Sequence, residues 1–322
     1  MAHQIDMTNN RANMAYIGGT PWHGLGINMP SEATLDQWRV AAGLDYSVMR
    51  TPAMYQAGDE LLQGEGDILY RSDNKAMLAH VSERYKIVQP REVVEFYRDL
   101  TDKHGFAMET IGALSDGRRV WALAKVGEGF TVGKNDRIEN YLLLATSYDK
   151  SMATRCQFTT VRVVCHNTLS MAVADKANCV TVSHSAMFDA DKVKLDMGII
   201  TASNATMQDA FTAMTQRKVA DKEALRWIAN ILFDIKDDKE LQEVSTKKSN
   251  IIKGVFDLYN GAGKGSSFET SHHTVFGMLN AITEHVDHHA ARNANNRLQS
   301  AWFGAGENMK AKAYESALAL VA

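Results

Sequence analysis

The chain has 322 residues, of which 45 % are hydrophobic and 23 % charged, a balance typical of a globular protein with one large or two smaller domains. Its 35 basic and 38 acidic residues leave a net charge of −3, which excludes the overall positive charge that drives salt-sensitive DNA binding. The N-terminus is polar, and no run reaches the roughly 18 apolar residues of a membrane helix, so we expect a cytoplasmic protein without membrane contact.

The first 90 residues contain all four prolines and predict an irregular arm followed by strands. Residues 1–30 form the arm, and Pro30-Ser31 begins a short helix. Strands are expected from Tyr46 onward, including a hairpin formed by 67–71 and 76–80.

The middle of the chain predicts one helix and two further hairpins. Pro90 begins an amphipathic helix that Gly105 ends. Tight turns are indicated at Asp116-Gly117 and at Asp149-Lys150-Ser151. The strands expected around these turns are 106–114 with 119–126, and 141–148 with 152–164.

From about residue 187 the pattern changes to one helix after another, with Gly261–Ser267 as a flexible connector. The expected helices are 189–217, 221–235, 238–258, 272–290 and 306–321. We therefore predict an α+β fold, in which antiparallel hairpins with packed helices precede a mainly helical C-terminal region. The predicted division is an N-terminal arm (1–30), an α+β core domain (31–186) and a helical region (187–322).

The central segment 158–172 joins a predicted strand to a predicted helix that starts at Asn167. Cys165 lies at this junction, where a helix N-terminus would favour a thiolate. A small buried residue that closes the strand explains Cys165 better. We therefore assign no catalytic residue, and the nucleophile stays an alternative. The other cysteines, Cys156 and Cys179, bring the total to three and indicate no disulfide framework.

Residues 284–289 form a histidine-rich stretch of a predicted helix. His285 lies one turn from His289, and Glu284 one turn from His288. A histidine pair of this spacing binds zinc in some proteins, but the sequence indicates no third ligand. We predict a polar helix face, with neither metal nor cofactor, and keep a contact surface as the alternative.

Basic residues are dense between 118 and 162. This stretch contains eight basic and four acidic residues, with aromatic residues interleaved among them. Such a surface suits single-stranded nucleic acid, because every base has a face to stack. Ordinary solvated charge over an aromatic core is the alternative, since strand alternation places Arg155 and Arg162 on opposite faces. The predicted nucleic-acid-binding residues are Arg118, Arg119, Trp121, Lys150, Arg155, Phe158 and Arg162.

The arm contains Trp22 and His23 beside two glycines, Gly24 and Gly26, that permit unusual backbone angles. We expect these residues to anchor the arm on a neighbouring subunit, which predicts a homo-oligomer. A direct ligand contact is the alternative.

Segments in order over nearly the whole chain form a recognisable set: Pro21–Gly26, Arg84–Gln89, Arg119–Trp121, Thr159–Leu169, Asn280–Glu284, Asp287–His288 and Trp302–Gly304. Together they resemble the phage/plasmid-like proteins catalogued as domain of unknown function 932. The resemblance marks eight motif residues of unknown role, whereas His285 and His289 lie at positions expected to vary. The eight are Trp22, His23, Cys165, Asn167, Asn280, Glu284, Asp287 and His288.

The resemblance implies a protein of phages or plasmids, and therefore the cytoplasm of a bacterial host cell as its location. The order of helix, two hairpins and helix between 90 and 167 is also similar to the compact core of phage single-strand annealing proteins. The first hypothesis is a non-enzymatic, homo-oligomeric protein that binds and anneals single-stranded DNA in recombination. One alternative is a protein-binding module that acts on a host defence or replication factor. Another is a nucleotide-acting enzyme that uses Cys165 or the His285/His288 helix.

Overall fold

The computed structural model describes most of the chain, namely residues 5–8, 10–19, 21, 24–162, 167–170, 179–196, 203–290 and 294–322. The chain divides into two compact units, each made of separate stretches of sequence. Unit 1 consists of 1–127, 141–157 and 179–199, and unit 2 of 128–140, 158–178 and 200–322. Within the described stretches, no helix combines the length and the apolar character that a membrane crossing requires. The predicted division into arm, core and helical region stays a prediction.

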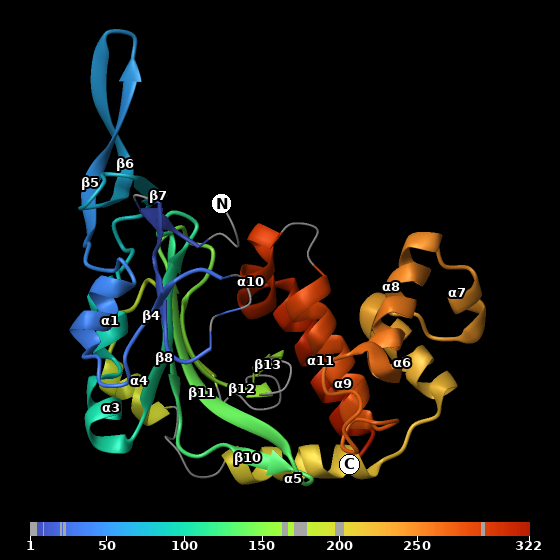
Figure 1. The fold of residues 1–322 in the computed structure, drawn as a ribbon. Coiled ribbons are helices and arrows are strands. Elements are labelled where there is room, and N and C mark those ends of the chain that lie inside the picture. Colours follow the sequence, from blue (N-terminus) through green and yellow to red (C-terminus); the bar gives the residue numbers. More distant parts are fainter. Residues whose placement is uncertain are drawn as a thin grey trace. The chain divides into compact units, whose positions relative to one another are not determined.

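Unit 1 is built around a sheet in the order β12-β11-β9-β8-β3-β4, and β14 pairs with β12 (Figure 1). The hairpin predicted at Asp116-Gly117 is confirmed, because Leu114 pairs with Arg119 across this turn. β8, β9 and β11 pair antiparallel, whereas β3 and β4 run parallel. The strands of this sheet are β3 (Met14–Tyr16), β4 (Ile27–Asn28), β8 (Ala107–Leu114), β9 (Arg119–Lys125), β11 (Asp136–Ser147), β12 (Thr154–Arg162) and β14 (Cys179–Val182), of which 136–140 in β11 and 158–162 in β12 belong to unit 2. β1 (Met7–Thr8) and β2 (Arg11–Ala12) form a separate two-stranded sheet.

A buried tyrosine between two of the short helices of unit 1 anchors them to the sheet. The Tyr97 hydroxyl donates to the carbonyl oxygens of Ala122 (2.8 Å) and Leu142 (3.0 Å), and burial raises the pKa of Tyr97 well above its usual value. The predicted helix from Pro90 to Gly105 consists of two helices, because the chain turns at Phe96 and Tyr97. The helices are α1 (Leu35–Ala41), α2 (Pro90–Glu95), α3 (Arg98–His104) and α4 (Ala190–Asp196).

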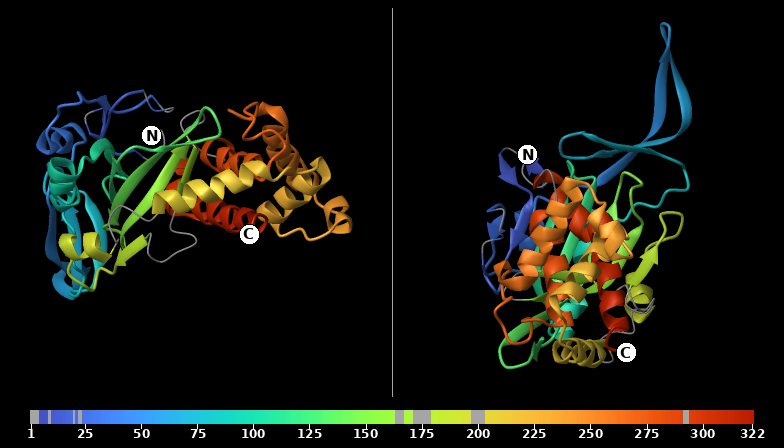
Figure 2. Two further views of the ribbon diagram at one scale, coloured as in Figure 1. Left: turned by 90° about the horizontal axis from the view of Figure 1, so that it is seen from below. Right: turned by 90° about the vertical axis from the view of Figure 1, so that its right-hand side faces the viewer.

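Unit 1 also contains a three-stranded antiparallel sheet in the order β5 (Val48–Ala57), β6 (Glu60–Arg71) and β7 (Met77–Val81). β6 and β7 form the hairpin predicted from the sequence. β5 and β6 form a second, longer hairpin that reaches away from the rest of unit 1 (Figure 2). A β-bulge next to Pro52 separates its proximal part from its tip, which turns at Gly58 with a φ of 63°.

A buried charged network at the base of β6 holds four segments of unit 1 together. The Arg71 side chain is 1 % exposed, and its Nη1 donates to Asp6 at 2.5 Å. Its Nε and Nη2 donate to both carboxylate oxygens of Asp73, at 3.0 and 2.7 Å. The guanidinium lies 4.0 Å from the ring centroid of Tyr46, and Asn13 donates to Asp6 at 2.6 Å. All three guanidinium nitrogens of Arg71 are therefore occupied by contacts that stabilise unit 1.

Unit 2 is mainly helical, as predicted for the C-terminal region. Its core contains an aromatic cluster in which the ring of Phe211 contacts those of Phe130, Phe276 and Tyr314. The elements are β10 (Phe130–Val132), β13 (Asn167–Ser170), α5 (Ser203–Gln216), α6 (Asp221–Phe233), α7 (Asp238–Gln242), α8 (Thr246–Asp257), α9 (Val275–Glu284), α10 (Ala294–Phe303), α11 (Ala305–Ala319) and two π-helical turns, η4 (Leu258–Ala262) and η5 (His285–His289).

The structure corrects the predicted elements at two places in unit 2. The helix expected from Asn167 is wrong, because Asn167–Ser170 pairs as a strand with Thr159–Arg162 of β12. The ladder hydrogen bonds of this pairing override the local helix propensity. The helix expected over 238–258 is divided into α7 and α8, because Ser245 caps a new helix by accepting from Lys248 N–H.

Candidate functional site

Three of the four arginines predicted to bind nucleic acid have interaction partners in the described structure. Arg119 donates to Ser151 Oγ at 2.9 Å, and its Nη2 lies 3.5 Å from Asp149. Arg118 lies 3.7 Å from the Asp116 carboxylate. Arg155 is half-buried and has an interaction partner. The side chain of Arg162 lies outside the described part of the structure.

The aromatic residues of the same stretch lie in the core. Trp121 is 1 % exposed and Phe158 is 6 % exposed, and Tyr148 is fully buried. Because their ring faces are covered by protein, a base has no surface to stack on at these positions. Trp121 and Phe158 are thus buried, whereas Lys150 is exposed, and the nucleic-acid-binding role expected for these residues stays a prediction.

Four of the predicted motif residues fall in segments that the structure describes only in part. Trp22, His23 and Cys165 lie outside the described residues. Asn167 begins β13, and its side chain is not described. The roles expected for these residues, including the nucleophile and the arm contact, stay predictions.

The motif residue Glu284 fastens a glycine-rich loop in unit 2. Its buried carboxylate accepts from Lys264 N–H through both oxygens, at 3.2 and 3.0 Å. A Cβ on Gly263 would lie only 3.0 Å from Glu284 Oε2 and 2.6 Å from Leu258 O, so glycine is required there. The loop expected to be a flexible connector is thus held by Glu284.

Asp287 forms a buried ion pair with Lys310 at 2.7 Å, which joins η5 to α11. The two side chains are 7 % and 2 % exposed. Asn280 donates to the carbonyl oxygen of Phe276, and His288 is half-buried with a partner of its own. In the described part of the chain, no group of three or more His, Cys, Asp or Glu side chains is arranged to hold a metal ion. The geometry gives Glu284 and Asp287 structural roles.

Because of the shifted pKa of His285, we expect the folded chain to lose stability in acid. Burial, with a smaller effect of His289, lowers its pKa from 6.5 to about 4. Between these pH values the unfolded chain binds a proton that the folded chain excludes, so stability falls as the pH falls, by at most about 3 kcal/mol. Urea denaturation between pH 7 and 4.5 should show a shallower loss for His285→Gln than for the parent chain. His104→Gln, which changes an exposed histidine, serves as the control. Equal slopes for His285→Gln and the parent chain would contradict this assignment.

The tip of the β5–β6 hairpin exposes large apolar side chains. Leu61 is 67 % exposed, Tyr55 54 %, Met54 49 % and Leu62 38 %. Tyr55 is paired directly with Leu62, so these two share one face of the hairpin. Met54 and Leu61 lie on the opposite face, diagonal to each other. Both faces of the tip are therefore apolar and uncovered, and this is the candidate functional site.

The hairpin tip, residues 53–65, is acidic as well as apolar. It contains Asp59, Glu60 and Glu65 and no lysine, arginine or histidine. The sequence analysis missed this element. The sequence signal for this hairpin was the turn sequence Gly58-Asp59. It lies between two stretches that each contain two consecutive apolar residues, Met54-Tyr55 and Leu61-Leu62.

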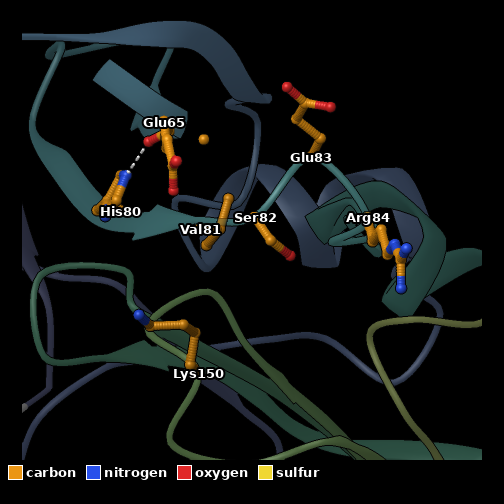
Figure 3. Close-up of a pocket in the computed structure, with 8 residues that line it drawn as sticks. Glu65, His80, Val81, Ser82, Glu83, Arg84 and Lys150 are labelled. Atoms are coloured by element: carbon orange, nitrogen blue, oxygen red, sulfur yellow. Dashed lines mark hydrogen bonds between the residues drawn. The ribbon is translucent and has the colours of Figure 1, made fainter.

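A pocket of about 480 Å³ lies at the root of the hairpin, in unit 1 (Figure 3). The His80 imidazole closes it on one side, where Nε2 donates to the Glu65 carbonyl oxygen at 2.7 Å. Lys150 lines the pocket from the turn between β11 and β12. The remaining lining residues are Gly66, Val81, Ser82, Glu83 and Arg84.

Comparison with known proteins shows that residues 77–302 match the model of the family described as Domain of unknown function (DUF932). No curated protein and no solved structure matches the chain. The family match contains the pocket residues from His80 to Arg84, Lys150 and the buried carboxylates Glu284 and Asp287, whereas the hairpin tip lies before it. Since the match spans more than half of the sequence, the chain belongs to the DUF932 family.

Proposed function

We propose that this protein acts by binding another protein, with the tip of the β5–β6 hairpin as the contact element. The observation that carries the proposal is the exposure of Met54, Tyr55, Leu61 and Leu62 on a hairpin that reaches into solvent. Apolar groups gathered on a projecting element mark interaction sites, because covering them removes apolar surface from water. This proposal corresponds to the protein-binding alternative of the sequence analysis.

The chemistry of the tip defines the partner. Leu61 and Tyr55 require an apolar groove, and Asp59, Glu60 and Glu65 favour a basic rim around it. β7 pairs with β6 only over Asp67–Tyr70. Within the described residues, no strand pairs with the outer edges of the tip, so a partner strand can add there. We therefore propose a partner protein with a basic-rimmed apolar groove, met in the bacterial cytoplasm.

The surface that is contacted in the cell can be mapped by photo-crosslinking. A photoreactive amino acid at position 61 is expected to give one discrete adduct with another protein. The same amino acid at Val40, which is 49 % exposed and lies on α1, is expected to give none. Equal adducts from both positions would contradict the proposal. An adduct of the chain with itself would show that the hairpin mediates self-association and not binding to another protein. That result would agree with the homo-oligomer predicted from the sequence.

The nucleic-acid hypothesis is tested beside this one with a mobility-shift series on single-stranded and duplex DNA. Trp121 and Phe158 are buried, and Arg118 and Arg119 face carboxylates, so we expect no binding of the purified chain to either DNA at about 50 mM salt. Preferential binding of single-stranded DNA that weakens with salt would favour the annealing hypothesis over the hairpin proposal.

A further inference from the structure

The pocket at the root of the hairpin contains charged side chains that the described part of the protein leaves unpaired. Lys150 and Arg84 line it, and neither forms an ion pair or a side-chain hydrogen bond within the described residues. This distinguishes them from Arg118 and Arg119, which face Asp116 and Asp149. Two cations on the wall of one pocket that no carboxylate neutralises can together attract an anion by Coulomb interaction.

Lys150 holds its position against a conformational preference. Its φ is 63°, the left-handed region that glycine and asparagine adopt more readily than lysine. A glycine at this turn would be less strained, so the fold does not require a lysine here. Unfavourable backbone angles concentrate at functional sites, where a particular side chain is needed.

The opposite wall of the pocket presents hydrogen-bond acceptors. His80 Nε2 donates to the Glu65 carbonyl, so in the neutral imidazole Nδ1 is left as an acceptor. The Glu65 carboxylate points into the same space above Lys150, whereas that of Glu83 points away (Figure 3). Gly66 lets the chain pass close to β7, because a Cβ there would lie 2.4 Å from Val81 O.

We propose that this pocket binds a small anion, a phosphate or carboxylate group held by Lys150 and Arg84, on a molecule whose other end donates hydrogen bonds to Glu65 and His80. The volume of about 480 Å³ suits a ligand of the size of a nucleoside monophosphate or an amino acid. The Ser82 hydroxyl, on the same wall as Arg84, is an additional donor for the anion. The proposal does not rest on the protein contact made by the hairpin tip, although Glu65 belongs to both elements.

The test uses the full chain with three probes, namely inorganic phosphate, AMP and glutamate, and with uncharged adenosine as the control. Titration calorimetry should give a Kd below about 1 mM for at least one anionic probe. NMR should show the amide signals of Gly66, His80 and Lys150 shifting with that probe. Phosphate and AMP report a phosphate site, and glutamate reports a carboxylate site. No binding by any anionic probe, or equal binding of adenosine, would overturn the proposal.

Two glycine variants separate ligand binding from folding. Lys150→Gly should keep or raise thermal stability, because it relieves the left-handed backbone, while weakening the bound probe about tenfold or more. Lys75→Gly makes the same change at an exposed lysine with a φ of 59° that does not line the pocket, and it should bind as the parent chain does. Arg84→Gln should weaken binding to a similar degree. Unchanged affinity in Lys150→Gly would contradict the assignment.

Discussion

Arg71→Met is expected to destabilise unit 1 by about 3–5 kcal/mol, a large part of the stability of a typical domain. The substitution leaves the Asp6 carboxylate, which is 4 % exposed, without its guanidinium partner in the protein interior. It also removes the two hydrogen bonds to Asp73 and the contact with the Tyr46 ring. Urea denaturation followed by circular dichroism measures the loss.

A matched control separates burial from charge. Arg98→Met removes another arginine of unit 1, but the Arg98 side chain is 47 % exposed and pairs with Glu95 at the surface. This variant should leave the denaturation midpoint nearly unchanged, because exposed ion pairs contribute little. If Arg71→Met and Arg98→Met shifted the midpoint equally, the network around Arg71 would not have the structural role derived from its geometry.

Lys310→Met is expected to destabilise unit 2 by a similar amount, about 3–5 kcal/mol, because it removes the buried cation that pairs with the Asp287 carboxylate at 2.7 Å. Adding Asp287→Leu should restore much of the loss, since a buried ion pair can be replaced by apolar side chains at little cost. Lys222→Met, which removes a lysine that is 72 % exposed, serves as the control and should have little effect. Unfolding monitored by circular dichroism compares the variants.

The Lys310 series also tests the role of a family motif residue. Restored stability in the double variant, together with unchanged binding to the partner, would show that Asp287 is structural. A double variant that folds but no longer binds its partner would instead place Asp287 in the function.

The sequence predicted those parts of the fold that local signals determine. The hairpin around Asp116-Gly117 was predictable because both strands and their turn lie within a single stretch of chain. The strand Asn167–Ser170 was not, because its pairing with β12 overrides a segment that reads locally as a helix. Pairs distant in sequence, such as Glu284 with Lys264 and Asp287 with Lys310, leave no local signal.

The candidate site was hard to predict for a different physical reason. A count of charges between 118 and 162 suggests a basic surface, but it does not show that Arg119 faces Asp149 or that the ring of Trp121 points inward. Tyr55 and Leu61 mislead in the opposite direction, because their apolar character suggests a buried strand although both side chains are exposed. Only the projecting hairpin shows that these side chains face solvent.

The most direct test of the central claim is the affinity of the purified chain for the purified protein that crosslinks at position 61. Tyr55→Lys combined with Leu61→Lys should raise the Kd about 100-fold or more, because interface hot spots of this kind contribute about 2 kcal/mol each. The unfolding free energy should stay within about 0.5 kcal/mol of the parent value, since both side chains are exposed. Val40→Lys combined with Leu195→Lys, at exposed positions on other elements, should leave the Kd unchanged. An equal Kd for the parent chain and the hairpin variant would contradict the account.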